Sequence, residues 1–141
     1  MSIMSGIMEG EDAAPVVSGG GDPGNVLEAN VSLAAGDFVH ISDFSGTGKL
    51  VKADAANDLC AHGFVLQAYS ATAMATFYSL GALNNQLSGM TPGATYWLST
   101  TAAGDIQATA PTTSGEIVQC LGDAISATEM RFTGDVYTVL A

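Results

Sequence analysis

Turn-forming residues interrupt this chain so often that no long regular element has room to form. In residues 87–132, short runs of strand-forming side chains alternate with turns rich in glycine and proline. Pro92 and Gly93 form the centre of one turn, because proline presets φ and glycine accepts φ > 0. Residues 95–99 and 106–109 flank a second turn at Gly104 and can pair as a hairpin.

The same alternation of short runs and turns continues on both sides of this stretch. A strand start is expected at 31–33, and strands within 38–41, 49–53, 61–69, 71–80, 95–99, 106–109, 116–126, 129–132 and 136–140, with a loop or one helical turn over 54–58. A turn at 45–48 makes 38–41 and 49–53 a hairpin, and alternation puts Leu50 and Val51 on opposite faces. Alternation in 61–69 places Phe64, Leu66 and Ala68 on one face. About nine short strands without a clear helix predict an all-β fold, a single small β-sandwich or β-barrel.

Residues 1–25 differ from the β-rich domain predicted over 26–141. Their glycine and proline content, including Pro15 and Pro23, prevents a stable element, so we expect an extended or disordered N-terminal arm. The arm nevertheless carries apolar side chains, namely Ile3, Met4, Ile7, Met8, Val16 and Val17. It is either a leader without a role or a segment that orders on a neighbouring subunit by adding a strand.

Charge limits the partners of the chain. Fourteen acidic residues face three basic ones, which gives a net charge of −11. This excess opposes contact with nucleic acid or anionic membranes, both of which require lysine or arginine. The acids either keep the protein soluble or complement a basic patch on a protein partner. No apolar run approaches the ~18 residues of a membrane helix, and the acidic N-terminal region lacks the basic start of a secretory signal.

Residues that usually carry chemistry are few. Neither His40 nor His62 is expected to have a Cys, His or Asp at metal-ligand spacing, so both are predicted to be structural, with no metal or cofactor. No Gly-x-Ser-x-Gly motif is present, and we expect no enzymatic activity. Cys60 and Cys120 lie among apolar neighbours, where they are either reduced core residues or a single disulfide.

Trp97 is the candidate for an oligomer interface. In the strand 95–99, Tyr96 and Leu98 share one face and Trp97 points to the other. If Tyr96 and Leu98 fill the core, Trp97 lies on the surface or in an interface, where tryptophan buries a large rigid area. The alternative is a two-layer sandwich with Trp97 in its core.

One resemblance narrows the function. The order of a Gly-x-x-Tyr-Trp-Leu strand, a glycine turn, a Pro-Thr loop and a Val-Gln-x-x-Gly-x-Ala strand resembles a small β-domain of tailed-bacteriophage structural proteins. The matching positions are Gly93, Tyr96, Trp97, Leu98, Gly104, Pro111, Thr112, Gly115, Val118, Gln119, Gly122 and Ala124. Asp123 departs from the pattern, which usually has an apolar residue there, so this strand is expected to be half exposed.

The resemblance implies a non-enzymatic virion protein. We favour a capsid decoration (cement) protein that assembles in the host cytoplasm, binds the major capsid protein on the outer surface of the head and forms a homotrimer. The alternative is a fibre, spike or tail-tip protein that binds a host receptor or glycan. Long fibres usually carry coiled-coil or repetitive shafts, and this chain has neither.

Overall fold

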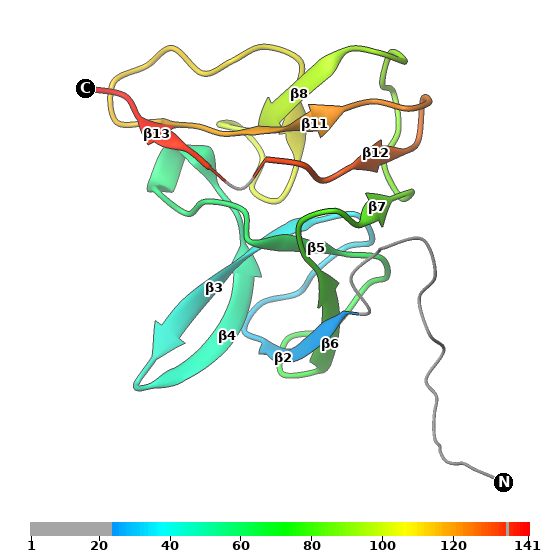
Figure 1. The fold of residues 1–141 in the computed structure, drawn as a ribbon. Coiled ribbons are helices and arrows are strands. Elements are labelled where there is room, and N and C mark those ends of the chain that lie inside the picture. Colours follow the sequence, from blue (N-terminus) through cyan, green and yellow to red (C-terminus); the bar gives the residue numbers. More distant parts are fainter. Residues whose placement is uncertain (1–23, 135) are drawn as a thin grey trace, which may run out of the picture.

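A computed structural model describes residues 24–134 and 136–141. The described part is almost entirely β-structure, which confirms the predicted all-β class (Figure 1). The strands are β2 (Asn25–Ala29), β3 (Phe38–Phe44), β4 (Thr47–Lys52), β5 (Gly63–Val65), β6 (Met74–Tyr78), β7 (Leu83–Asn84), β8 (Thr95–Leu98), β9 (Ile106–Gln107), β10 (Ile117–Val118), β11 (Cys120–Asp123), β12 (Met130–Arg131) and β13 (Thr138–Val139).

The helical content of the described residues is the short 3-10 turn η1 (Ala55–Asn57). Asp54 caps it by accepting a hydrogen bond from the backbone N–H of Ala56, as a residue at a helix N-terminus should. The helical turn considered for residues 54–58 is therefore confirmed. No helix in the described ranges is long and apolar enough to cross a membrane. Of the predicted arm, residues 1–23 lie outside the described residues, and with them all six apolar side chains named above.

Five strands close into a barrel in the order β2-β4-β3-β5-β6, at the lower side of Figure 1. Its longest pairing is the β3–β4 hairpin, in which Val39 faces Lys52 and Phe44 faces Thr47 across the turn predicted from the sequence. Strand β2 closes the barrel between β6, to which it is antiparallel, and β4, to which it is parallel. Because the ring is closed, each of these five strands has a neighbouring strand on both sides.

The barrel interior is small and apolar. Its buried residues are Ala29, Leu33, Val39, Leu50, Val65, Ala75 and Phe77. Alanines on β2 and β6 keep the narrow interior from overfilling, and Phe77 is its largest side chain. The expected opposition of Leu50 and Val51 is seen, since Leu50 is buried and Val51 is only half-buried.

Three small sheets form the upper half of the molecule in Figure 1: β11-β8-β9, β12-β7 and β10-β13. The β8–β9 hairpin predicted around Gly104 is present, with Leu98 facing Ile106. The strand that contains Asp123 is half exposed as expected, because Leu121 and Gly122 are buried while Cys120 and Asp123 are exposed.

A second and larger core joins the two halves. Phe38, Phe64 and Phe132 meet there with ring centroids 5.6 to 6.3 Å apart, in tilted and edge-on arrangements that aromatic pairs favour. Phe38 on β3 and Phe64 on β5 point into this core, whereas their neighbours Val39 and Val65 point into the barrel. Strand β5 and the first two residues of β3 are thus buried on both faces and form a shared wall between the two halves.

This shared wall explains one wrong prediction. Residues 61–69 do not form one amphipathic strand: β5 spans Gly63–Val65 only, and Ala68 is exposed. A strand that is buried on both faces is short and continuously apolar, so its sequence lacks the alternation of apolar and polar residues that would indicate its bounds. The strand start expected at residues 31–33 is also wrong, because β2 ends at Ala29 and Leu33 makes only an isolated bridge to Tyr69.

The single strand expected over 116–126 is instead two strands with different partners. Strand β10 pairs with β13 and β11 pairs with β8. The chain changes partner at Gln119, whose buried side chain hydrogen-bonds to the backbone N–H and C=O of Ala61. The break follows from this distant contact, which the local sequence does not indicate.

Candidate metal centre

Two histidines and a cysteine converge beside the shared wall. The antiparallel register of β3 and β5 pairs Phe38 with Phe64 and Val39 with Gly63. The next positions in this register are His40 and His62, so their rings lie side by side, stacked with centroids 4.5 Å apart. Cys60 precedes His62 by two residues and, in extended backbone, points to the same side.

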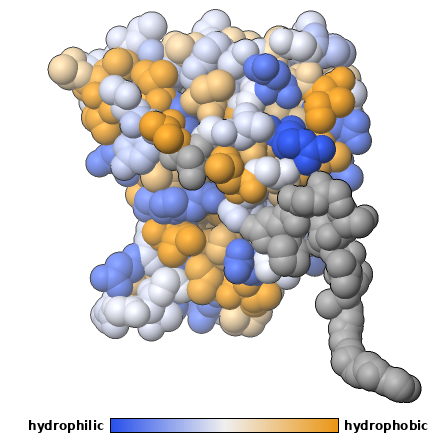
Figure 2. All heavy atoms as spheres, viewed as in Figure 1, coloured by the Kyte–Doolittle hydropathy of each residue, from blue (hydrophilic) through white to orange (hydrophobic). Residues whose placement is uncertain are grey.

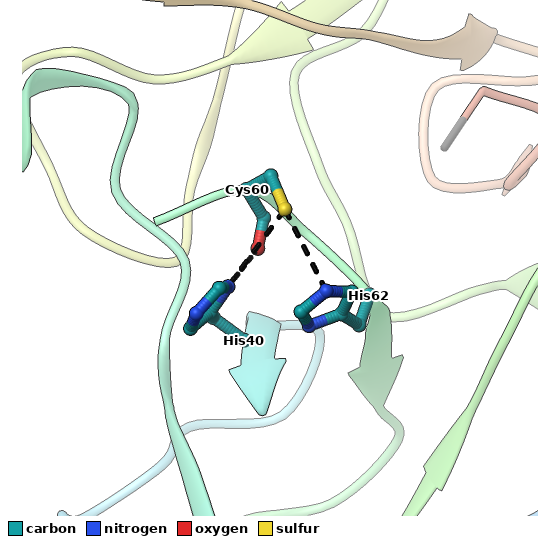
Figure 3. A group of neighbouring side chains, drawn as sticks. All are labelled: His40, Cys60 and His62. Atoms are coloured by element: carbon teal, nitrogen blue, oxygen red, sulfur yellow. Dashed lines mark hydrogen bonds between the residues drawn. The ribbon is translucent and has the colours of Figure 1, made fainter. Parts of the chain in front are cut away.

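The three side chains bring their donor atoms to one point (Figure 3). The Sγ atom of Cys60 lies 3.6 Å from Nε2 of His62 and 3.8 Å from Nδ1 of His40. One ligand atom from each residue falls within 4.8 Å of the others. Cys60 is buried, whereas both imidazoles are half-buried, so the group opens to solvent on the histidine side.

Backbone contacts define which ring nitrogen carries a proton. His62 accepts a hydrogen bond at Nδ1 from the N–H of Ile41 at 2.9 Å, so its proton lies on Nε2, toward the sulfur. His40 places Nδ1 2.8 Å from the carbonyl oxygen of Cys60. A carbonyl only accepts, so this nitrogen is protonated. Both rings therefore direct an N–H group at Cys60.

The C-terminal segment also reaches this group. The hydroxyl of Tyr137 hydrogen-bonds to the side chain of Cys60. A negative charge on Cys60, once its thiol is deprotonated, raises the pKa of Tyr137, and burial and the Asp58 carboxylate act in the same direction. Residues from β3, from the segment before β5 and from the end of the chain thus meet at one sulfur atom.

This donor set suits a soft or borderline metal ion. One thiolate and two imidazoles are typical ligands of Zn²⁺. Coordination would displace the hydrogen bonds of both rings, at about 1 kcal/mol each in net terms. Ile41 lies at the surface, so water can replace the partner that its N–H would lose.

This group was not predicted from the sequence. Neither His40 nor His62 was expected to have a neighbouring ligand, and that expectation is wrong, because the structure brings Cys60 within reach of both. One signal was present, the Cys60-x-His62 spacing, which places both side chains on the same face of an extended segment. The third member could not be found without the β3–β5 register.

The two cysteines differ in environment. Cys60 is buried and Cys120 is exposed, and neither forms a disulfide. The expectation of two core cysteines is therefore right for Cys60 and wrong for Cys120. A register shift between Cys120 and Gly122 turns Leu121 and Gly122 inward and leaves the Cys120 thiol outside.

Trp97 lies outside this group. Tyr96 and Leu98 are buried, as expected, and Trp97 is half-buried on the opposite face of β8. It faces Cys120 on one side and Gln107 on the other. Its part in an oligomer interface stays a prediction.

Comparison with known proteins adds no relative. No protein-family model matches the chain, and no curated protein matches it.

Proposed function

We propose that this protein is a non-enzymatic decoration protein on the outer surface of a tailed-bacteriophage head. The proposal starts from the resemblance of residues 93–124 to virion β-domains. It assigns the protein a role in binding rather than catalysis: the β-domain attaches to the major capsid protein and adds buried area across the joints of the shell.

The observation that carries the proposal is the number of large apolar side chains left on the surface. Among the described residues these are Val26, Ile41, Phe44, Met74, Leu80, Ile125, Val136, Tyr137 and Val139. Val136 is 82% exposed. Apolar groups appear on both halves of the face shown in Figure 2. Val136, Tyr137 and Val139 lie within four consecutive positions, and apolar side chains that gather on a surface mark sites of protein–protein contact.

Two of these side chains lie where the predicted arm joins the barrel. Val26 on β2 faces Thr76 on β6, and Glu28 faces Met74 two positions further along. Val26 and Met74 are therefore diagonal neighbours on the outer surface of the barrel. This position supports a docking surface that continues from the barrel into the arm.

The charge distribution supports a protein partner with basic groups. The three basic residues are engaged within the molecule: Lys49 with Glu28 at 3.3 Å, Lys52 with Asp37 at 3.4 Å, and Arg131 with the carbonyl oxygen of Gly81 at 2.8 Å. The other acids of the described part of the chain form no ion pair with lysine or arginine. They would attract a basic partner and set the orientation of docking more than its strength.

The barrel suits this role because its strands are paired in a closed ring. Closed barrels do not present long free edges to other chains, so copies do not aggregate before they reach the particle. We further propose a homotrimer at local three-fold positions of the shell, with Trp97 in the contact. Light scattering should give three chain masses, and a monomer that touches no sibling on the shell would exclude the trimer.

The test is binding to heads that lack decoration. Purified protein is mixed with undecorated heads and separated by sedimentation, and the bound copies are counted against added protein. We expect saturable binding at many copies per head, with at least about 1,000 Å² buried per stable contact. Absence of binding to heads together with binding to host cells would replace this proposal by the fibre, spike or tail-tip alternative.

A further inference from the structure

We propose that His40, Cys60 and His62 bind one Zn²⁺ ion through the Cys60 thiolate and one nitrogen of each imidazole. The chain contains two histidines and two cysteines in all, and three of these four residues meet at one point. This inference does not depend on the function proposed above and is tested on the purified protein alone.

The spacing of the donor atoms matches a tetrahedral zinc site. Zn–S bonds of ~2.3 Å and Zn–N bonds of ~2.05 Å at a tetrahedral angle separate sulfur and nitrogen by about 3.6 Å. The observed separations from Sγ are 3.6 Å to His62 and 3.8 Å to His40. The sulfur–nitrogen separations thus already match, but the two imidazole rings are stacked and must turn so that one nitrogen of each points at the same ion.

The surroundings fit one buried ligand and two accessible ones. Cys60 is only 6% exposed and belongs to the apolar core that joins the two halves, so the thiolate is shielded from water. His40 and His62 are half-buried and leave a path for the ion from solvent. The fourth position lies open to water or to the nearby Tyr137 hydroxyl, since three protein ligands leave one site free.

When Zn²⁺ binds, each proton on the three ligands is either released or moved to another atom. Three coordinate bonds form to zinc, and the zinc ion gives up water molecules in exchange. The Cys60 thiol releases its proton to solvent. Each imidazole keeps one proton and moves it to the other nitrogen: from Nδ1 to Nε2 in His40, and from Nε2 to Nδ1 in His62. The carbonyl of Cys60 and the N–H of Ile41 lose their ring partners in the process.

The donor set also determines which metal ions the site does not bind. Mg²⁺ and Ca²⁺ require oxygen ligands, and among these three residues the site offers sulfur and nitrogen. Zn²⁺ would connect β3 to the segment before β5 at the wall shared by the two halves. The expected result of binding is a higher resistance to unfolding, because an ion that binds only the folded chain stabilises it by mass action.

The experiment uses the full chain, reduced and stripped of metal with a chelator. Zn²⁺ is titrated by calorimetry, and Co²⁺ serves as the spectroscopic probe. We expect one Zn²⁺ per chain and a rise of the thermal midpoint with Zn²⁺ but not with Mg²⁺. The Co²⁺ complex should show the intense visible bands of tetrahedral cobalt and a thiolate-to-cobalt charge-transfer band.

Matched variants assign the ligands. Cys60→Ala should remove the charge-transfer band and weaken Zn²⁺ binding at least about 100-fold, and His40→Gln and His62→Gln at least about 10-fold each. Cys120→Ala changes the exposed cysteine outside the group and should leave binding unchanged. The two histidine variants alter half-buried rings, so they report on the site even if Cys60→Ala does not fold. Absence of Zn²⁺ binding, or binding unchanged in all three ligand variants, would overturn the proposal.

Discussion

Gln119 shows how one side chain organises two distant parts of this fold. Its amide accepts a hydrogen bond from the N–H of Ala61 at 2.8 Å and donates to the carbonyl oxygens of Ala61 at 2.9 Å and Gly134 at 3.1 Å. Gln119 is fully buried, and both ends of its amide are satisfied, so the side chain links the point where the chain changes partner to the segment before β5. It also holds the chain beside Cys60 in place.

We expect Gln119→Leu to destabilise the protein by about 2–4 kcal/mol, because it leaves the N–H and C=O of Ala61 unpaired in the core at about 1–3 kcal/mol each. Urea unfolding measures the change. The control is Gln86→Leu at an exposed position, which should stay within about 0.5 kcal/mol. A loss below about 1 kcal/mol in Gln119→Leu would mean that water replaces the amide.

Tyr69 gives a prediction that depends on pH. Burial raises the pKa of Tyr69, but hydrogen bonds to its oxygen from Gln67 at 2.9 Å and from the N–H of Thr76 at 3.2 Å bring the pKa below the ordinary value of 10.0. In the window between the folded pKa and 10.0, the unfolded chain binds more protons than the folded chain. Stability from this group therefore rises as the pH rises through that window.

Tyr69→Phe removes this contribution and leaves the N–H of Thr76 unpaired. We expect a loss of about 1 kcal/mol at neutral pH and a gap to the wild type that widens as the pH approaches 10. Urea unfolding of both proteins over a series of pH values measures the difference in their free energies of unfolding. The other tyrosines are present in both proteins, so they do not contribute to this difference. A gap that narrows with rising pH would contradict the assigned hydrogen bonds.

At the scale of elements, features that depend on local sequence could be predicted, and features that depend on contacts between distant segments could not. The β3–β4 and β8–β9 hairpins and the turn η1 could be predicted because their turn residues act on neighbouring backbone. The break at Gln119 and the short β5 could not, because both depend on packing between segments far apart in the sequence. The same holds for the site: Cys60-x-His62 is local, and His40 joins it only through strand register.

Gly63 tests the tight packing of β5. A Cβ atom there would lie 2.5 Å from the carbonyl oxygen of Tyr78 and 3.1 Å from the ring of Phe77. Backbone atoms cannot move aside without disturbing the strand pairing, so Gly63→Ala should lower the free energy of unfolding by about 2–3 kcal/mol, measured by thermal or urea unfolding. In the control Gly48→Ala, the new Cβ meets side-chain atoms rather than backbone, Ile41 at 3.2 Å and Leu27 at 3.8 Å, and the change should cost less than about 1 kcal/mol. Equal costs in the two variants would contradict tight packing at β5.

At the scale of the whole molecule, two cores share one wall and leave apolar side chains outside. The predicted arm was bounded at residue 25, but Asn25 pairs with Phe77 and belongs to β2. A deletion that spares the barrel therefore removes residues 1–23. The role of the removed residues in binding stays a prediction.

We expect the protein lacking residues 1–23 to keep its thermal midpoint within about 4 °C, a shift that corresponds to roughly 1 kcal/mol or less. Its attachment to undecorated heads should weaken, because the apolar side chains of the arm would no longer be buried on a neighbour. Equally tight attachment would make the arm a leader without function. Unfolding of the truncated protein would place these residues in the core.

The central functional proposal is that the protein stabilises a phage head from outside. The direct measurement heats DNA-filled, undecorated heads with increasing amounts of the purified protein and records the temperature at which DNA is released. We predict a release temperature that rises and reaches a plateau when the binding sites are full. A release temperature that does not change, although the protein is present in excess, would contradict the proposal.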